Sequence, residues 1–138
     1  MRFDRMNDEM LRAIIETLPG EITVIDANDE VVGWNRHETR RFRRPMTCMG
    51  LNFRRCHPAE SLPLIEKLVE ELRNGQKDVV HFWLDADMPP DTKKHKILVA
   101  FHALRDTAGK YLGCMEWAQD IEYIRGLEGE KRLVAREA

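Results

Sequence analysis

The spacing of apolar residues along the chain changes from three or four positions to two, and the change predicts an order of helices and strands. Over residues 3–18 apolar side chains recur at the spacing of one helix face, and a Pro-Gly pair follows. Two β-branched runs at 21–26 and 31–35 are separated by the turn-rich residues 27–30. These segments predict a leading helix followed by a β-hairpin.

The second half of the chain predicts one further helix and three strands. Residues 36–57 have no sustained period and are interpreted as short helices and turns. An apolar stripe over 58–74, with proline at its start and Asn-Gly at its end, predicts a helix. Three runs of strand composition follow at 78–85, 97–104 and 111–119, and a helical tail is expected from residue 121.

This order predicts an α+β domain. Sequential strands joined by short turns usually pair antiparallel, so we expect a five-stranded antiparallel sheet with helices covering one face and helices flanking it at both ends. The chain then divides into an amphipathic helix at 1–18, a sheet domain at 19–122 and a helical tail at 123–138. A half-wrapped sheet of this kind can hold a small ligand between its concave face and the covering helices. The apolar stripe of the leading helix predicts a homodimer.

Composition excludes several other classes of protein. A length of 138 residues corresponds to one domain, and 22 Lys and Arg against 24 Asp and Glu leave a formal charge of −2. With no basic field, neither nucleic acid nor a membrane is expected as a partner. No signal peptide or apolar span is present, which predicts a cytoplasmic protein. The three cysteines, Cys48, Cys56 and Cys114, are expected to be reduced thiols.

The order of elements and several local motifs over residues 8–125 resemble a PAS domain. Residues 18–27, Leu-Pro-Gly-Glu-Ile-Thr-Val-Ile-Asp-Ala, resemble its first strand, and Val32-Gly33-Trp34-Asn35 its second. Residues 106–122 resemble its last hairpin and terminal Asp-Ile-Thr signature, with Glu122 in place of Thr. More narrowly, three motifs resemble the PAS module that ends a family of prokaryotic proteins with a hemerythrin-like domain. These motifs are Arg55-Cys56-His57-Pro58, residues 78–83 (Asp-Val-Val-His-Phe-Trp) and residues 127–133 (Leu-Glu-Gly-Glu-Lys-Arg-Leu).

The resemblance implies a sensory or signalling module rather than an enzyme. No phosphate-binding loop, nucleophile elbow or kinase signature is present in the sequence. We expect a small-molecule ligand in the central cavity, with the signal passing through terminal helices and dimerisation to a downstream protein in trans. The alternative is a redox or gas sensor that contains haem or, as a weaker candidate, flavin.

A flavin photosensor is disfavoured at the reactive position. Residues 50–56, Gly-Leu-Asn-Phe-Arg-Arg-Cys, resemble the flavin-binding motif of the light-sensing LOV branch of PAS domains. Phe53 stands where that branch has its adduct-forming cysteine, and Cys56, three positions along, is expected to point elsewhere. The alternative interpretation is a Gly-Asn turn with a core Phe.

His57 is the candidate ligand to the metal if haem is bound, because it lies at the start of the covering helix. The usual ligand of haem-containing relatives lies farther along that helix, where this chain has Ile65, Leu68 and Val69. The competing interpretation is a histidine that only helps the helix to begin.

The remaining cofactor-binding candidates lie on predicted strands. Either His81 or His102 could face a pocket, although burial with a hydrogen-bond partner is the commoner role of a strand histidine. The aromatic candidates could stack on a planar cofactor or pack in the core or a dimer interface. The candidates carried forward are His102, Trp34, Trp83, Trp117 and Met115.

Arginines concentrate in residues 36–55 and could bind an anionic ligand, haem propionates or nucleic acid, or form a solvated face. They are Arg36, Arg40, Arg41, Arg43, Arg44, Arg54 and Arg55.

Overall fold

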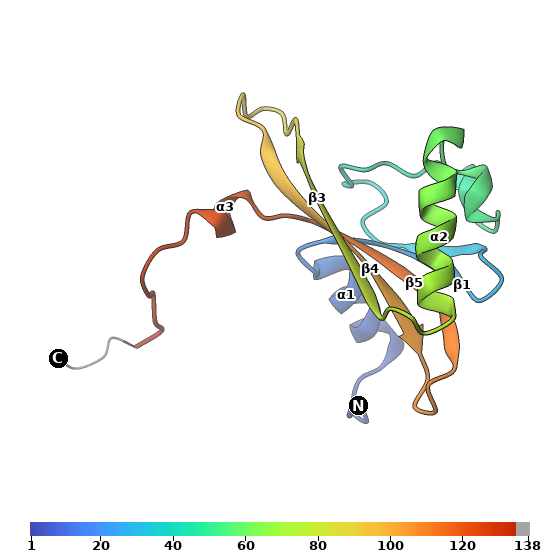
Figure 1. The fold of residues 1–138 in the computed structure, drawn as a ribbon. Coiled ribbons are helices and arrows are strands. Elements are labelled where there is room, and N and C mark those ends of the chain that lie inside the picture. The colour runs from blue at the N-terminus through green and yellow to red at the C-terminus, as the bar shows by residue number, and fades with distance from the viewer. Residues whose placement is uncertain (135–138) are drawn as a thin grey trace.

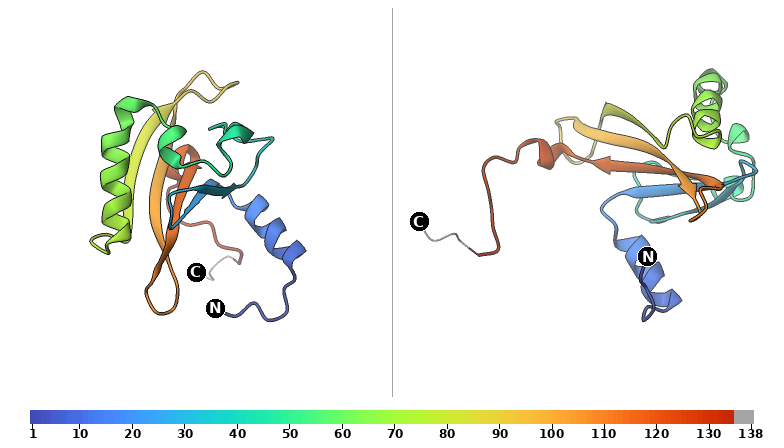
Figure 2. Two further views of the ribbon diagram at one scale, coloured as in Figure 1. Left: turned by 90° about the vertical axis from the view of Figure 1, so that its right-hand side faces the viewer. Right: turned by 60° about the horizontal axis from the view of Figure 1, so that its bottom comes forward.

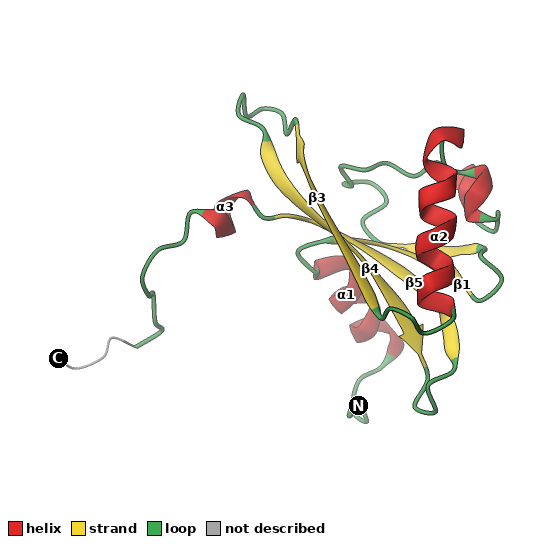
Figure 3. Ribbon diagram, viewed as in Figure 1, coloured by secondary structure: helices red, strands yellow, loops and turns green. Residues whose placement is uncertain are grey.

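The structure is a computed structural model that describes residues 1–134. Its strands are β1 (Glu21–Asp26), β2 (Val31–Trp34), β3 (Val79–Ala86), β4 (His95–Arg105) and β5 (Tyr111–Asp120). Its α-helices are α1 (Asp8–Thr17), α2 (Leu62–Arg73) and α3 (Glu122–Arg125) (Figure 1). Three short 3₁₀ turns, η1 (Met46–Cys48), η2 (Phe53–Arg55) and η3 (Ala59–Ser61), lie between β2 and α2. Figure 3 shows the helices and strands in separate colours.

The five strands form one antiparallel sheet in the order β2-β1-β5-β4-β3. This confirms the predicted α+β architecture. The first and last strands lie side by side, with Glu21 opposite Ala118 and Asp26 opposite Gly113. Gly113 is required there, because a Cβ at this position would lie 2.1 Å from the carbonyl oxygen of Ile25.

Helix α2 covers one face of the sheet and closes the hydrophobic core (Figure 2). The helix has proline in its first turn and ends at Arg73, followed by the capping residue Asn74 and by Gly75 in the left-handed region. Leu72 is completely buried on its inner face. The buried core residues around it are Ile25, Val31, Phe53, Leu68, Val69 and Cys114.

Helix α1 lies on the opposite side of the sheet from α2 (Figure 2). It is shorter than predicted, because the Asn7 side chain accepts a hydrogen bond from the Met10 amide at 2.9 Å and caps the helix there. None of its residues is buried. Its end is tied to the sheet by Asn35, whose Nδ2 donates to the carbonyl oxygens of Ile15 at 2.9 Å and Gly20 at 3.1 Å.

The predicted helical tail at 123–138 is wrong over most of its described length. Helix α3 ends at Arg125, and residues 126–134 contain no helix. Gly126 and Gly129 interrupt the segment, Gly129 with a φ of 61°, and a short unpacked helix is marginal in water. Residues 135–138 of this prediction lie outside the described residues. Across residues 1–134, none of the helices has the length and apolar character needed to cross a membrane.

His95 joins the loop between β3 and β4 to the end of β5. Its Nδ1 lies 2.6 Å from Oδ2 of Asp120, and its Nε2 lies 2.7 Å from Oδ2 of Asp91. The hydrogen bonds to these carboxylates, that to Asp120 first, raise the pKa of His95. The protonated imidazole therefore holds this end of the sheet together.

Candidate functional site

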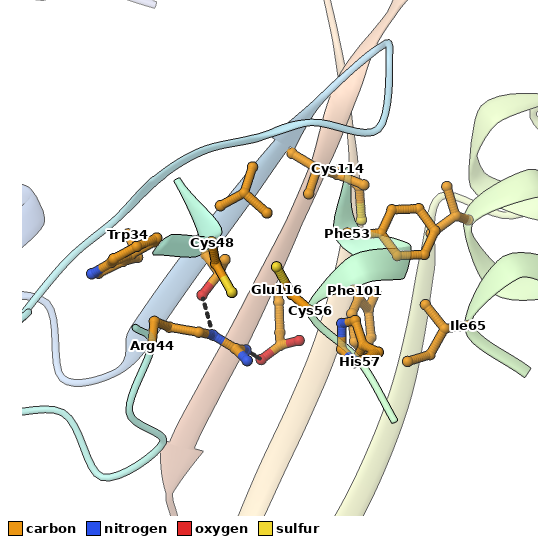
Figure 4. Close-up of a pocket in the computed structure, with 14 residues that line it drawn as sticks. Trp34, Arg44, Cys48, Phe53, Cys56, His57, Ile65, Phe101, Cys114 and Glu116 are labelled. Carbon is orange, nitrogen blue, oxygen red and sulfur yellow. Dashed lines mark hydrogen bonds and ion pairs between the residues drawn. The ribbon is translucent and has the colours of Figure 1, made fainter. Parts of the chain in front are cut away.

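A mostly apolar cavity of about 50 Å³ lies between α2 and the sheet (Figure 4). By volume it accommodates about three to five water molecules, since each needs roughly 10–15 Å³ of such space. Its lining comes from β1, β2, β4, β5, α2 and the segment between β2 and α2, whereas α1, β3 and residues 121–134 contribute none. The lining residues are Thr23, Ile25, Val31, Trp34, Arg44, Cys48, Phe53, Cys56, His57, Ile65, Val69, Phe101, Cys114 and Glu116.

The strand register decides which side chains face this cavity. Thr23, Glu116 and Phe101 are successive register partners on β1, β5 and β4, and partners in an antiparallel ladder share a face. The segment between β2 and α2 forms the opposite wall. It is anchored to the hairpin by the Phe53 amide, which donates to the carbonyl oxygen of Asp29 at 2.9 Å, and by the Val31 amide, which donates to that of Leu51 at 2.9 Å.

One end of the cavity carries an ion pair in an otherwise apolar lining. Arg44 donates through NH2 to Oε1 of Glu116 at 2.8 Å and through Nε to the hydroxyl of Thr23 at 3.3 Å. Both charged side chains are about four-fifths covered, with exposed fractions of 21% and 18%. Close by, buried Arg40 is balanced by Glu21 at 3.9 Å. The charges at this end therefore cancel.

His57 lines the cavity. Burial, followed by the positive charge of Arg44, lowers the pKa of its imidazole, so the ring is neutral near pH 7. Haem does not fit the site, because its macrocycle needs a pocket of several hundred Å³ and the cavity measures about 50 Å³. The same limit applies to a flavin ring system.

Three thiols also lie at the cavity, and burial raises the pKa of two of them. The pKa of Cys56 rises to about 11, first by burial and then by its hydrogen bond with Cys48, and that of Cys114 rises to about 12 by burial. Phe53 and Cys56 both line the cavity. Among residues 1–134 no group of three or more His, Cys, Asp or Glu side chains is arranged to hold a metal ion.

The structure brings Trp34 and His57 to the cavity and places the other sequence candidates on the opposite face of the sheet. Four of the predicted residues therefore do not line this cavity. His102 and Met115 are register partners, and each lies one position from a cavity residue, Phe101 and Glu116. Side chains alternate along a strand, so a shift of one position moves them to the other face. The four residues placed there are His102, Trp83, Trp117 and Met115.

The pairing of Arg44 with Glu116 was not predicted from the sequence. Glu116 lies between Met115 and Trp117 in a strand that is otherwise largely apolar. A charged residue in such a position could have indicated a functional role. The partner of Glu116 is 72 positions away in a segment without a regular period. Spacing alone therefore could not match them.

Three other arginines of the cluster, Arg36, Arg40 and Arg54, make contacts within the fold. Arg40 is 3% exposed and donates to the carbonyl oxygens of Ile22, Asn35 and Phe42. Arg54 pairs with Asp29 and Glu66, and Arg36 donates to both carboxylate oxygens of Glu16 from its backbone amide. These contacts distribute the charges around the loop rather than on one binding surface.

A family model and several solved structures indicate the same type of domain. A family model described as a PAS domain matches residues 11–122. The C-terminal domain of a Streptococcus mutans protein has a similar structure, with a TM-score of 0.81 and 30% identity, covering 93% of this chain and 96% of that one. The PAS domain of BvgS from Bordetella pertussis follows at a TM-score of 0.59 and 17% identity, covering 86% and 91%.

A ligand-bound structure is also similar. VqmA of Vibrio cholerae bound to DPO gives a TM-score of 0.57 at 20% identity, over 81% of this chain and 57% of that one. A search of curated protein sequences finds no match.

Proposed function

The chain belongs to the PAS domain family, whose members are sensory signalling modules, and from this premise we propose that it senses a small molecule in the cavity beneath α2. In this proposal the module is not catalytic. Binding changes the flanking segments and the dimer, and a separate protein in trans receives the signal. The narrower resemblance to modules attached to a hemerythrin-like domain stays a prediction.

The cavity is the observation that carries this proposal. It is lined by the buried core residues Phe53, Val69 and Cys114 and ends in the Arg44–Glu116 pair. A packed core normally contains few voids larger than a water molecule, and a void with convergent polar groups is the usual form of a ligand site. VqmA supports the proposal as a protein of similar fold whose solved structure is bound to DPO.

A route from the cavity to α1 runs through β1 and β2. Thr23 and Trp34 line the cavity and are register partners, and Asn35 follows Trp34 directly. Asn35 accepts from the Ile22 amide at 2.7 Å and donates to the last turns of α1 through Ile15. A ligand that moves the β1–β2 pair therefore moves the attachment of α1.

Helix α1 supports the proposed homodimer. Its exposed apolar side chains include Met10 (53% exposed), Ile14 (40%) and Ile15 (42%). The sheet face opposite α2 also exposes apolar surface, with Trp83 68% exposed. Exposed apolar patches of this kind mark interaction sites, and a second copy would cover α1 and the sheet face together.

Small molecules released from the natively purified protein test the sensing proposal. We expect mass spectrometry of the extract to recover one compound at close to one per chain. Ile65→Trp, which narrows the cavity from α2, should deplete it, whereas Leu64→Trp on the solvent side of the same helix (Leu64 is 74% exposed) should retain it. Wild-type protein that releases nothing beyond a blank, or equal retention by both variants, contradicts the proposal.

A further inference from the structure

The charges at the polar end of the cavity determine which ligands can bind there. Arg44 contributes one positive charge and Glu116 one negative charge, 2.8 Å apart, while His57 is kept neutral by burial and by Arg44. A ligand with a net charge would enter a site where each fixed charge already has its partner. It would lose its own hydration without gaining an uncompensated counter-charge.

The ion pair leaves hydrogen-bonding groups of both kinds available. Within residues 1–134, Arg44 uses Nε and NH2, and its NH1 group makes no hydrogen bond; Glu116 uses Oε1, and its Oε2 accepts none. A donor and an acceptor from one ion pair therefore stand at the same end of the cavity. The rest of the lining is mostly apolar, with Ile25, Phe53 and Val69 among its residues.

We infer that the ligand is a small neutral molecule with a hydrogen-bond donor and an acceptor side by side, as in a primary amide or a lactam, and with a short apolar body. Its carbonyl oxygen accepts from NH1 of Arg44, and its N–H donates to Oε2 of Glu116. The inference rests on the proposed function and specifies the ligand class of the same site. Both charges of the pair remain compensated when such a ligand binds.

Three planar probes of the same size separate the charge classes: propionamide (neutral), propionate (anion) and propionamidine, which is a cation at pH 7. Each has five non-hydrogen atoms, in keeping with the cavity of about 50 Å³. Dissociation constants can be taken from amide chemical shifts in NMR titrations. In wild-type protein we expect propionamide to bind about tenfold more tightly than either ion.

Removing one charge at a time should change the order of affinities. Glu116→Gln leaves Arg44 without its counter-charge and should make propionate the tightest probe; Arg44→Gln should do the same for propionamidine. Matched controls are Glu122→Gln and Arg125→Gln, because these residues form an Arg–Glu pair at 2.6 Å outside the cavity. Both controls should keep the wild-type order.

Three results would overturn the inference: an ion binding to wild-type protein as tightly as propionamide, an unchanged order in both cavity variants, or no probe shifting the amides of the cavity segments. A charged compound recovered from the purified protein would overturn the ligand class and leave the sensing proposal standing. Failure of sensing itself would appear separately, as the absence of any recovered compound.

Discussion

Replacing Asn35 should destabilise the protein more than any substitution of a surface asparagine. Asn35 is 1% exposed, and its side chain makes three hydrogen bonds, from the Ile22 amide and to the carbonyl oxygens of Ile15 and Gly20. At about 1 kcal/mol for each bond, Asn35→Ala should lower the free energy of unfolding by about 3 kcal/mol. For a domain whose total stability is about 5–15 kcal/mol, that is a large fraction.

The isosteric variant Asn35→Asp isolates the hydrogen bonds from the packing. It keeps the acceptor for the Ile22 amide but places a carboxylate oxygen against two carbonyl oxygens, so it should lose at least as much stability as Asn35→Ala. Urea unfolding, monitored by tryptophan fluorescence, measures the free energy of unfolding of both Asn35 variants. Asn28→Ala, at an exposed turn position, is the matched control and should change stability by less than about 0.5 kcal/mol. A loss below about 1 kcal/mol, or an Asp variant as stable as wild type, would refute the reasoning.

Three further predictions concern association, pH and thiol chemistry. Ile14→Glu should shift the mass measured by light scattering toward a single chain, and Arg12→Glu, also exposed on α1, should not; a wild-type monomer at high concentration contradicts the dimer. The pKa of His95 is raised by its two carboxylate partners, so its contribution to stability is complete below about pH 6.5 and is lost as pH rises through the folded pKa. Urea unfolding should show this loss in wild type but not in His95→Gln, and equal pH profiles would contradict it. With a pKa of about 11, Cys56 should react slowly with iodoacetamide at pH 7, and its rate should still be rising at pH 10; a rate that levels off by pH 8 would show a normal thiol.

The sequence predicted the fold well, because hydrophobic spacing is a local signal with a global consequence. The β-branched runs became β1 and β2, and Pro-Gly and Asn-Gly pairs stand after α1 and α2. The tail was predicted poorly, since its few apolar residues, Leu127 among them at 66% exposed, have nothing to pack against within residues 1–134.

The site was predicted less completely than the fold. Its lining depends on which face of the sheet each strand residue lies on and on contacts between residues far apart in the sequence. Alternation along β4 and β5 divides the side chains into two sets without showing which set faces α2. His102 and Met115, predicted to bind a cofactor, belong to the set that faces away from α2. Helix α2 settles the matter by packing against Cys114 and its face of the sheet. His57, which lines the cavity, could be selected because it adjoins that helix in the chain, a relation that is visible without tertiary contacts.

Amide hydrogen exchange in α1 tests most directly whether the cavity is the input of a sensor. The comparison is between protein as natively purified, with its bound compound, and the same protein after unfolding, removal of the compound and refolding. We expect greater protection of residues 53–69 in the bound form together with a change in residues 8–17, on the opposite side of the sheet. Exchange that is identical in residues 8–17 of the two forms would contradict transmission from the cavity to α1.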